Sequence, residues 1–138
     1  MITDNKLNIV FISEDHRQMF YATCKTFGYE AAHDPYHLAA AYLMTLDRVT
    51  RTHIDDIFDF NGDSIKPEGL NKDWQTSTSL KTTRLLFNLW NGYNANGEPL
   101  EEEKPSAYCT PENIFCCSYA PYYWQAIKIR YPEYTQNA

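Results

Sequence analysis

The chain has 138 residues, a net charge of −6 and an apolar fraction of 43%, which fits one folded domain with a buried core. The negative charge argues against non-specific binding of nucleic acid and against an anionic membrane surface, because both require a basic footprint. It leaves open a protein partner that is itself basic, including an enzyme that binds DNA or RNA.

Two features concern the cellular compartment. No apolar run approaches the length of a membrane span, and the start of the chain, MITDNKLNIVFISEDH, has an early acid and an apolar run too short for a signal peptide. We therefore expect a cytoplasmic protein with no membrane partner. In that reducing compartment the four cysteines should be free thiols: Cys24, Cys109, Cys116 and Cys117.

The first segment predicts an extended arm and then a helix. Leu7–Ile12 is apolar and β-branched, but no second strand accompanies it, which favours an extended arm over residues 1–12. Ser13 is a typical N-cap, and the helix that it begins should run to about Phe27, where Gly28 ends it.

A second helix begins at Asp34-Pro35, a capping residue followed by proline at the first helical position. The sequence that follows, YHLAAAYLMTLDRV, predicts one core helix up to Val49, since its alanines allow close approach of a neighbour. Thr50–Phe60 begins with polar caps and predicts a short third helix. Asn61-Gly62 then predicts a turn.

The segment from Ile65 to Tyr93 combines loop, cap and helix signals. A proline and a glycine predict an irregular start, after which Thr76, Ser77 and Thr78 are three candidate N-caps. The helix should run to Asn91, with Gly92 in the position that favours left-handed geometry. Its apolar residues cover much more than one face, so it should be buried and central.

The last third of the chain predicts a loop and two helices. Residues 94–109 hold prolines, a glycine and three consecutive glutamates, and should form an exposed, mobile loop. Thr110-Pro111 caps a helix, and Tyr122–Arg130 predicts another, which Pro132 stops. The final residues, 133–138, are expected to be a tail.

Together these elements predict a mainly α fold. Five or six helices should form a single compact domain over residues 1–138, around a central helix at Ser79–Asn91. We find no internal repeat and no domain boundary. The high aromatic fraction of 15% supplies bulky side chains that fill gaps between short helices, or a sticky surface for a partner.

Trp74 lies among polar residues and allows two interpretations. It closes the loop onto the core with its indole N–H bonded to a backbone carbonyl, or it faces a ligand. Lys66, Glu68 and Arg84 are close to Trp74 in sequence, and these four residues are the nearest approach to a polar pocket. Salt bridges that serve the fold explain the charged residues equally well.

Two acidic clusters are candidate interaction surfaces. The first contains Asp55, Asp56, Asp59 and Asp63, and the second contains Glu101, Glu102 and Glu103. Asp59-x-Asn61-x-Asp63 begins like a calcium-binding loop, but Ser64 replaces the required glycine and Leu70 the required glutamate. We therefore interpret the first cluster as a negative helix end, and either cluster as able to occupy a basic groove.

Metal and catalytic signals are weak. His33 and His37 are four residues apart, but the cap at Asp34 places His33 outside the helix, which spoils a zinc geometry. His16 and His53 are predicted to be surface or capping residues. No nucleophile elbow, phosphate loop or dinucleotide fingerprint is present, so we predict no catalytic residue, metal or cofactor.

A resemblance to a known family is carried by residues 65–93, IKPEGLNKDWQTSTSLKTTRLLFNLWNGY. It extends to FISEDH, DIFDF and IFCCSYAPYYWQAIKIRYPEY, and so covers most of the chain. These segments resemble the domain-of-unknown-function 6075 family, short uncharacterised proteins associated with Firmicutes and with their phages or mobile elements. The resemblance implies a genomic setting rather than a mechanism.

From these observations we expect a non-enzymatic module that binds a protein partner. In the setting that the resemblance implies, the target would be a bacterial defence enzyme such as a CRISPR nuclease, inhibited by stoichiometric binding. One alternative is a small-ligand binder or enzyme that uses the polar residues around Trp74. Another is a toxin–antitoxin component.

Overall fold

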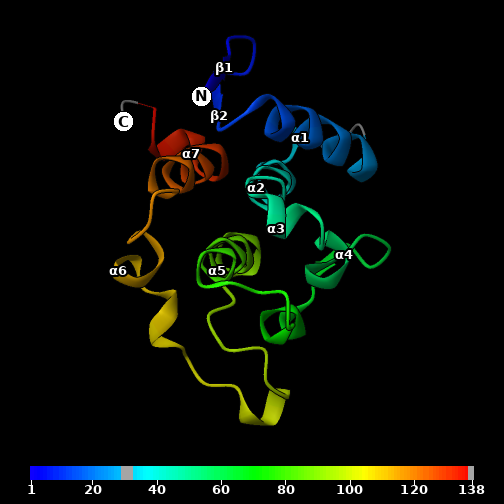
Figure 1. Ribbon diagram of the computed structural model, residues 1–138, viewed down its shortest axis with the longest axis vertical. Coiled ribbons are helices and arrows are strands. Elements are labelled where there is room, and N and C mark those ends of the chain that lie inside the picture. The colour runs from blue at the N-terminus through cyan, green and yellow to red at the C-terminus, as the bar shows by residue number, and fades with distance from the viewer. Residues whose placement is uncertain (29–32, 137–138) are drawn as a thin grey trace.

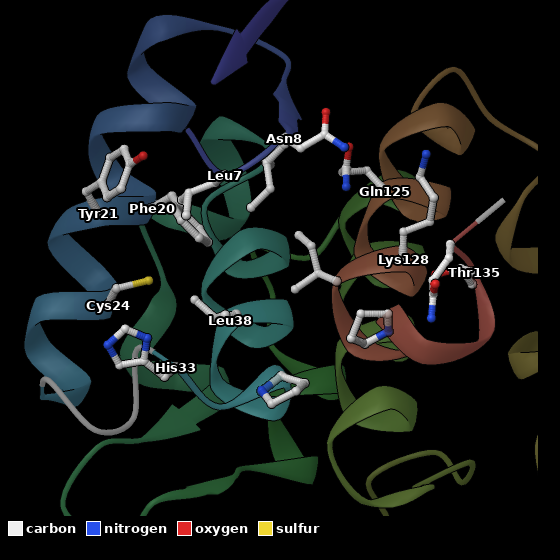
Figure 2. A pocket seen from close by; sticks show the side chains of 15 residues that line it. Leu7, Asn8, Phe20, Tyr21, Cys24, His33, Leu38, Gln125, Lys128 and Thr135 are labelled. Atoms are coloured by element: carbon white, nitrogen blue, oxygen red, sulfur yellow. The ribbon is translucent and has the colours of Figure 1, made fainter. Parts of the chain in front are cut away.

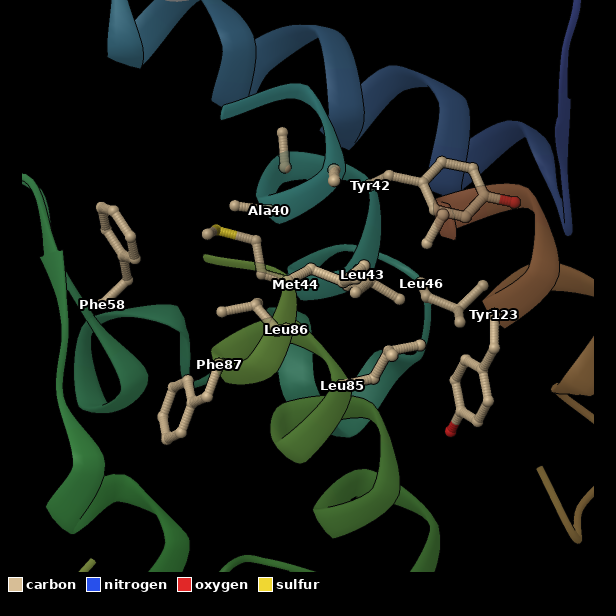
Figure 3. Packing of buried hydrophobic residues seen from close by; sticks show 14 of the residues in the cluster. Ala40, Tyr42, Leu43, Met44, Leu46, Phe58, Leu85, Leu86, Phe87 and Tyr123 are labelled. Atoms are coloured by element: carbon tan, nitrogen blue, oxygen red, sulfur yellow. The ribbon is translucent and has the colours of Figure 1, made fainter. Parts of the chain in front are cut away.

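Two buried helices, α2 (Pro35–Met44) and α5 (Ser77–Asn91), form the interior of the computed structural model, which describes residues 1–28 and 33–136 (Figure 1). From Ala39 onward every side chain of α2 is buried, so this helix has no polar face there. The buried apolar side chains of α5 are Leu85, Leu86, Phe87 and Leu89 (Figure 3). A helix that is apolar all round must be covered on all sides.

Two further long helices supply that cover: α1 (Glu14–Phe27) and α7 (Ala120–Arg130) both pack on α2. The remaining helices are short: α3 (Arg48–Arg51), α4 (Ile54–Ile57) and α6 (Pro111–Ile114). The described residues thus form seven α-helices in one compact domain, which confirms the predicted mainly α class. The prediction named α5 alone as the centre, and α2 lies as deep as α5.

The first eleven residues form a β-hairpin, so the predicted extended arm is wrong. β1 (Ile2–Asp4) pairs in antiparallel fashion with β2 (Ile9–Phe11). Turn residues make the reversal: the Asp4 carboxylate accepts hydrogen bonds from the two backbone N–H groups of Lys6 and Leu7, and Asn8 has a φ of 57°. Strands of three residues are too short to produce an alternating pattern in the sequence.

His16 in the first turn of α1 is fully buried, which corrects the prediction of a surface or capping residue. Ser13 does cap α1, because its Oγ accepts the His16 N–H at 3.1 Å. The imidazole Nδ1 accepts the Ile12 N–H at 3.2 Å, and Nε2 donates to the Tyr42 carbonyl at 2.9 Å. Burial lowers the pKa of His16 to about 4, so the ring is neutral at pH 7.

α2 ends at Met44, so the predicted continuation to Val49 is wrong. The helix predicted over Thr50–Phe60 is reduced to α4, and α3 lies before it. Asp47 explains why the apolar pattern does not form one long helix. Its carboxylate accepts the Thr50 N–H at 2.7 Å and the Thr50 hydroxyl at 2.8 Å, which caps α3 in the middle of the apolar pattern.

A second hairpin follows α4. β3 (Phe58–Asp59) pairs in antiparallel fashion with β4 (Ser64–Ile65) around the predicted Asn61-Gly62 turn. The Asp59 carboxylate accepts both backbone N–H groups of that turn at 3.1 Å. The acid spacing that begins like a calcium loop is therefore explained by a hydrogen-bonded turn.

α5 begins with a reciprocal cap. Thr76 Oγ1 accepts the Ser79 N–H at 3.0 Å, and Ser79 Oγ accepts the Thr76 N–H at 2.7 Å. The helix starts two residues before the predicted Ser79 and ends at Asn91 as predicted. Gly92 follows in the left-handed conformation with a φ of 80°.

The C-terminal helices differ little from the prediction. Thr110 caps α6, since its hydroxyl accepts the Asn113 N–H. α7 begins two residues before the predicted Tyr122, because Pro121 fits the first turn of a helix. A 3-10 helix, Pro132–Tyr134, follows, and residues 137–138 of the predicted tail lie outside the described residues.

Candidate functional site

The residues of the predicted polar pocket point to separate neighbours. The Lys66 ammonium donates to a backbone carbonyl of α4 at 2.7 Å. Arg84 donates to a backbone carbonyl within residues 94–109 at 3.1 Å. Glu68 is exposed, and Trp74 contacts other side chains. The hydrogen bonds of Lys66, Trp74 and Arg84 thus lead to different parts of the domain.

Trp74 closes its loop against α4. The indole ring is half-buried and stacks on His53, with ring centroids 4.3 Å apart and planes 9° from parallel. Its Nε1–H donates to the Asp56 carboxylate at 2.8 Å, where a backbone carbonyl had been predicted as acceptor. Trp74 therefore makes both its ring stacking and its hydrogen bond with residues of the same domain.

Most of the first acidic cluster holds the fold together. Asp56 binds the indole described above, and Asp59 shapes the second hairpin. Asp63 lies 2.8 Å from Nε2 of His37 on α2. Asp55 is exposed, and its carboxylate makes no ion pair with the described residues. Of these four acids, Asp55 is the one most available to a partner.

The second cluster lies on residues 94–109, here named the acidic loop, which is fixed to the domain. The Tyr93 hydroxyl accepts the Gly97 N–H at 2.8 Å and donates to the Glu103 carboxylate at 3.0 Å. The Asn71 side-chain amide donates to two loop carbonyls at 3.0 and 3.2 Å. A Cβ at Gly97 would lie 2.3 Å from a backbone oxygen, so only glycine allows this approach.

The fixed loop presents three acids, Glu98 among them, and one aromatic ring to solvent. Glu101 and Glu102 are exposed, and the Tyr108 side chain is 65% exposed beside the Arg84 guanidinium. Residues 55–104 hold ten of the eighteen acidic side chains and five of the twelve basic ones. The excess of negative charge thus falls within this segment, and Figure 1 shows its acidic loop at the end of the molecule opposite β1 and β2.

The titratable side chains with described contacts serve the fold. Both nitrogens of His16 are bound to the backbone. Burial raises the pKa of the Cys24 thiol to about 12, so this thiol stays protonated and is a poor nucleophile. None of the four cysteines is in a disulfide. Within residues 1–28 and 33–136, no three His, Cys, Asp or Glu side chains are grouped to hold a metal ion.

A pocket that the sequence did not predict lies between α1, α2 and α7, beside β2, and is here named the α1–α7 pocket (Figure 2). Its volume is about 610 Å³, within the range of pockets that hold small molecules. Apolar side chains that line it are Leu7, Ile9, Phe20, Leu38 and Ile129. Polar side chains that line it include Asn8, Tyr21, Gln125 and Lys128.

Comparison with known proteins gives one match. The model of a family of unknown function, DUF6075, matches residues 6–138. No curated protein and no solved structure matches the chain. In the part of the chain that the structure describes, no helix has the length and apolar character needed to cross a membrane.

Proposed function

The chain belongs to DUF6075, a family of unknown function, and we propose that it is a non-enzymatic module that binds a basic protein partner through the acidic loop. One observation carries this proposal. The loop has several hydrogen bonds to the domain, yet Glu101, Glu102 and Tyr108 point away from that support into solvent.

A loop that is ordered before binding loses little conformational entropy when it meets a partner. An exposed tyrosine supplies contact area at low entropic cost, and the acids of the same loop attract a basic surface from a distance. Asp55 is exposed on α4 and adds a further negative charge to the surface. Tyr108 is therefore the proposed anchor, and the carboxylates form the rim that guides association.

The genomic setting that the resemblance implies suggests the partner. A protein of phages or mobile elements that acts in the cytoplasm gains from blocking a defence nuclease. Such enzymes present basic grooves to nucleic acid, and an acidic protein surface can occupy such a groove. We propose inhibition by stoichiometric binding of this kind, comparable to that of an anti-CRISPR protein.

Neutralising two exposed acids tests the proposal. The partner for this test is the protein that co-purifies with the tagged chain from its host. The double variant Glu101→Gln and Glu102→Gln should slow association with that protein about tenfold at low salt. It should also flatten the salt dependence of the association rate, because rim charges steer encounter. Stability should change by less than about 0.5 kcal/mol, since both side chains are exposed. Association rates measured by surface plasmon resonance at several salt concentrations give the readout.

A matched control removes the same charge elsewhere. Glu112→Gln with Glu133→Gln changes two exposed acids outside the acidic loop, so its association rate should stay near that of the unmodified protein. Equal slowing by both double variants would show that net charge alone matters. Normal association of the loop variant would remove the loop from the interface.

A further inference from the structure

The α1–α7 pocket combines an apolar interior with very little charge. Phe20, Ile9 and Cys24 on its wall are buried, and Leu38 and Ile129 are half-buried. No aspartate or glutamate is among the described residues that line it, although the chain carries eighteen acids. The wall therefore favours an apolar group and does not repel a negative one.

Two of the titratable groups on this wall, Tyr21 and Cys24, are uncharged. Burial, with the hydrogen bond to Asp4, raises the pKa of the Tyr21 hydroxyl to about 12. Burial alone raises the pKa of Cys24 to the same level, so both groups are neutral at pH 7. The Asp4 carboxylate is occupied by the Tyr21 hydroxyl and by two backbone N–H groups of its own turn.

Gln125 on α7 presents a donor that no described residue uses. The side chain is 7% exposed, and its Oε1 accepts the Val10 N–H of β2 at 3.0 Å. That bond fixes the orientation of the carboxamide, because a backbone N–H requires the oxygen and not the nitrogen. The amide Nε2 therefore donates to no described residue, and Figure 2 shows Gln125 beside the pocket.

Lys128 lies one helical turn after Gln125, so the two side chains share a face of α7. It is the only lysine, arginine, aspartate or glutamate among the described residues that line the pocket. It is half-buried and forms no ion pair with the described residues. A lysine without a carboxylate partner at the pocket can donate a charge-assisted hydrogen bond to an anionic ligand.

We propose that the α1–α7 pocket binds a small amphipathic carboxylic acid, with an alkyl or aryl tail. The carboxylate accepts hydrogen bonds from the Gln125 Nε2 and the Lys128 ammonium, and the tail lies against Ile9, Leu38 and Ile129. The pocket is at the end of the molecule opposite the acidic loop, so this site is independent of the protein interface proposed above (Figure 1).

Three probes with the same ten-carbon tail test the site: decanoate, 1-decanol and decylammonium. Decanoate should bind the full chain with one saturable site and about tenfold more tightly than decanol, because a charge-assisted hydrogen bond contributes about one order of magnitude in affinity. Calorimetry gives the affinities. Methyl NMR shifts of Ile9, Leu38 and Ile129 should follow the same saturation curve, which locates the ligand.

Two variants separate the roles of charge and donor. Lys128→Met should lower decanoate affinity about tenfold and leave decanol unchanged. Gln125→Glu keeps an oxygen for the Val10 N–H, but it replaces the donor by a carboxylate that can pair with the Lys128 ammonium, so it should remove the preference for decanoate over decanol. Lys25→Met, an exposed lysine of α1 that does not line the pocket, is the control and should change nothing.

The proposal is overturned if decanoate and decanol bind equally, if no saturable shift occurs at the three pocket residues, or if Lys128→Met and Lys25→Met behave alike. Should Gln125→Glu fail to fold, Lys128→Met still tests the proposal. The charged end of Lys128 reaches the rim of the pocket, and removal of that charge leaves the apolar interior intact. Preference of the unmodified protein for decylammonium also refutes the site.

Discussion

Leu86→Ala is expected to lower the free energy of unfolding by about 2–5 kcal/mol, because it empties space at the contact between α2 and α5. Leu86 is 1% exposed and lies beside Met44 in the packed interior (Figure 3). Urea unfolding followed by tryptophan fluorescence measures the loss. A loss this large is a substantial part of the total stability of a small domain.

Two controls accompany the Leu86 experiment. Leu86→Met keeps the side-chain volume and should cost less than about 1.5 kcal/mol. Leu80→Ala removes the same atoms from a half-buried position on α5 and should cost clearly less than Leu86→Ala. If the two alanine variants lose the same stability, the packing between α2 and α5 does not dominate the interior.

Acid is expected to destabilise the fold through His16 before the carboxylates titrate. The pKa of buried His16 is lowered to about 4 from an ordinary value of 6.5, so between these pH values the unfolded chain binds a proton that the folded protein does not. Stability therefore falls as the pH drops from 6.5. The loss between pH 7 and pH 5 should be about 2 kcal/mol from this one group.

The variant His16→Gln isolates that contribution. Glutamine can bond the backbone but cannot take up a proton, so its unfolding free energy should change about 2 kcal/mol less between pH 7 and pH 5. The difference between the two proteins removes the effects of all other titrating groups. Equal pH dependence of both proteins would mean that His16 is protonated while folded, contrary to its burial.

Local capping signals explain why the starts of the helices were predictable. Ser13, Asp34, Thr76 and Thr110 each accept the backbone bond that their position in the sequence indicates. Asp47 has the same chemistry, but the apolar residues around it concealed the break. His16 was missed even though it stands four residues before Phe20, on the same face of α1.

The α1–α7 pocket could not be predicted because distant segments build it. Val10 and Gln125 are 115 positions apart, and nothing local in the sequence indicates that they meet. The available hint was the spacing of Gln125 and Lys128, which places a donor and a cation on one helical face. Trp74 shows the opposite case, since its anchoring role was one of the two interpretations that the sequence allowed, and its acceptor, Asp56, came from the fold.

Photo-crosslinking in the host cell tests most directly whether the acidic loop contacts a protein. A photoreactive amino acid in place of Glu102 should yield one protein adduct of defined mass, in a complex with one copy of each chain. The same amino acid in place of Lys25 should yield none, and added Glu101→Gln should weaken the loop adduct. No adduct at position 102, equal adducts at both positions, or a biological effect far below one copy per target would contradict stoichiometric binding through the loop.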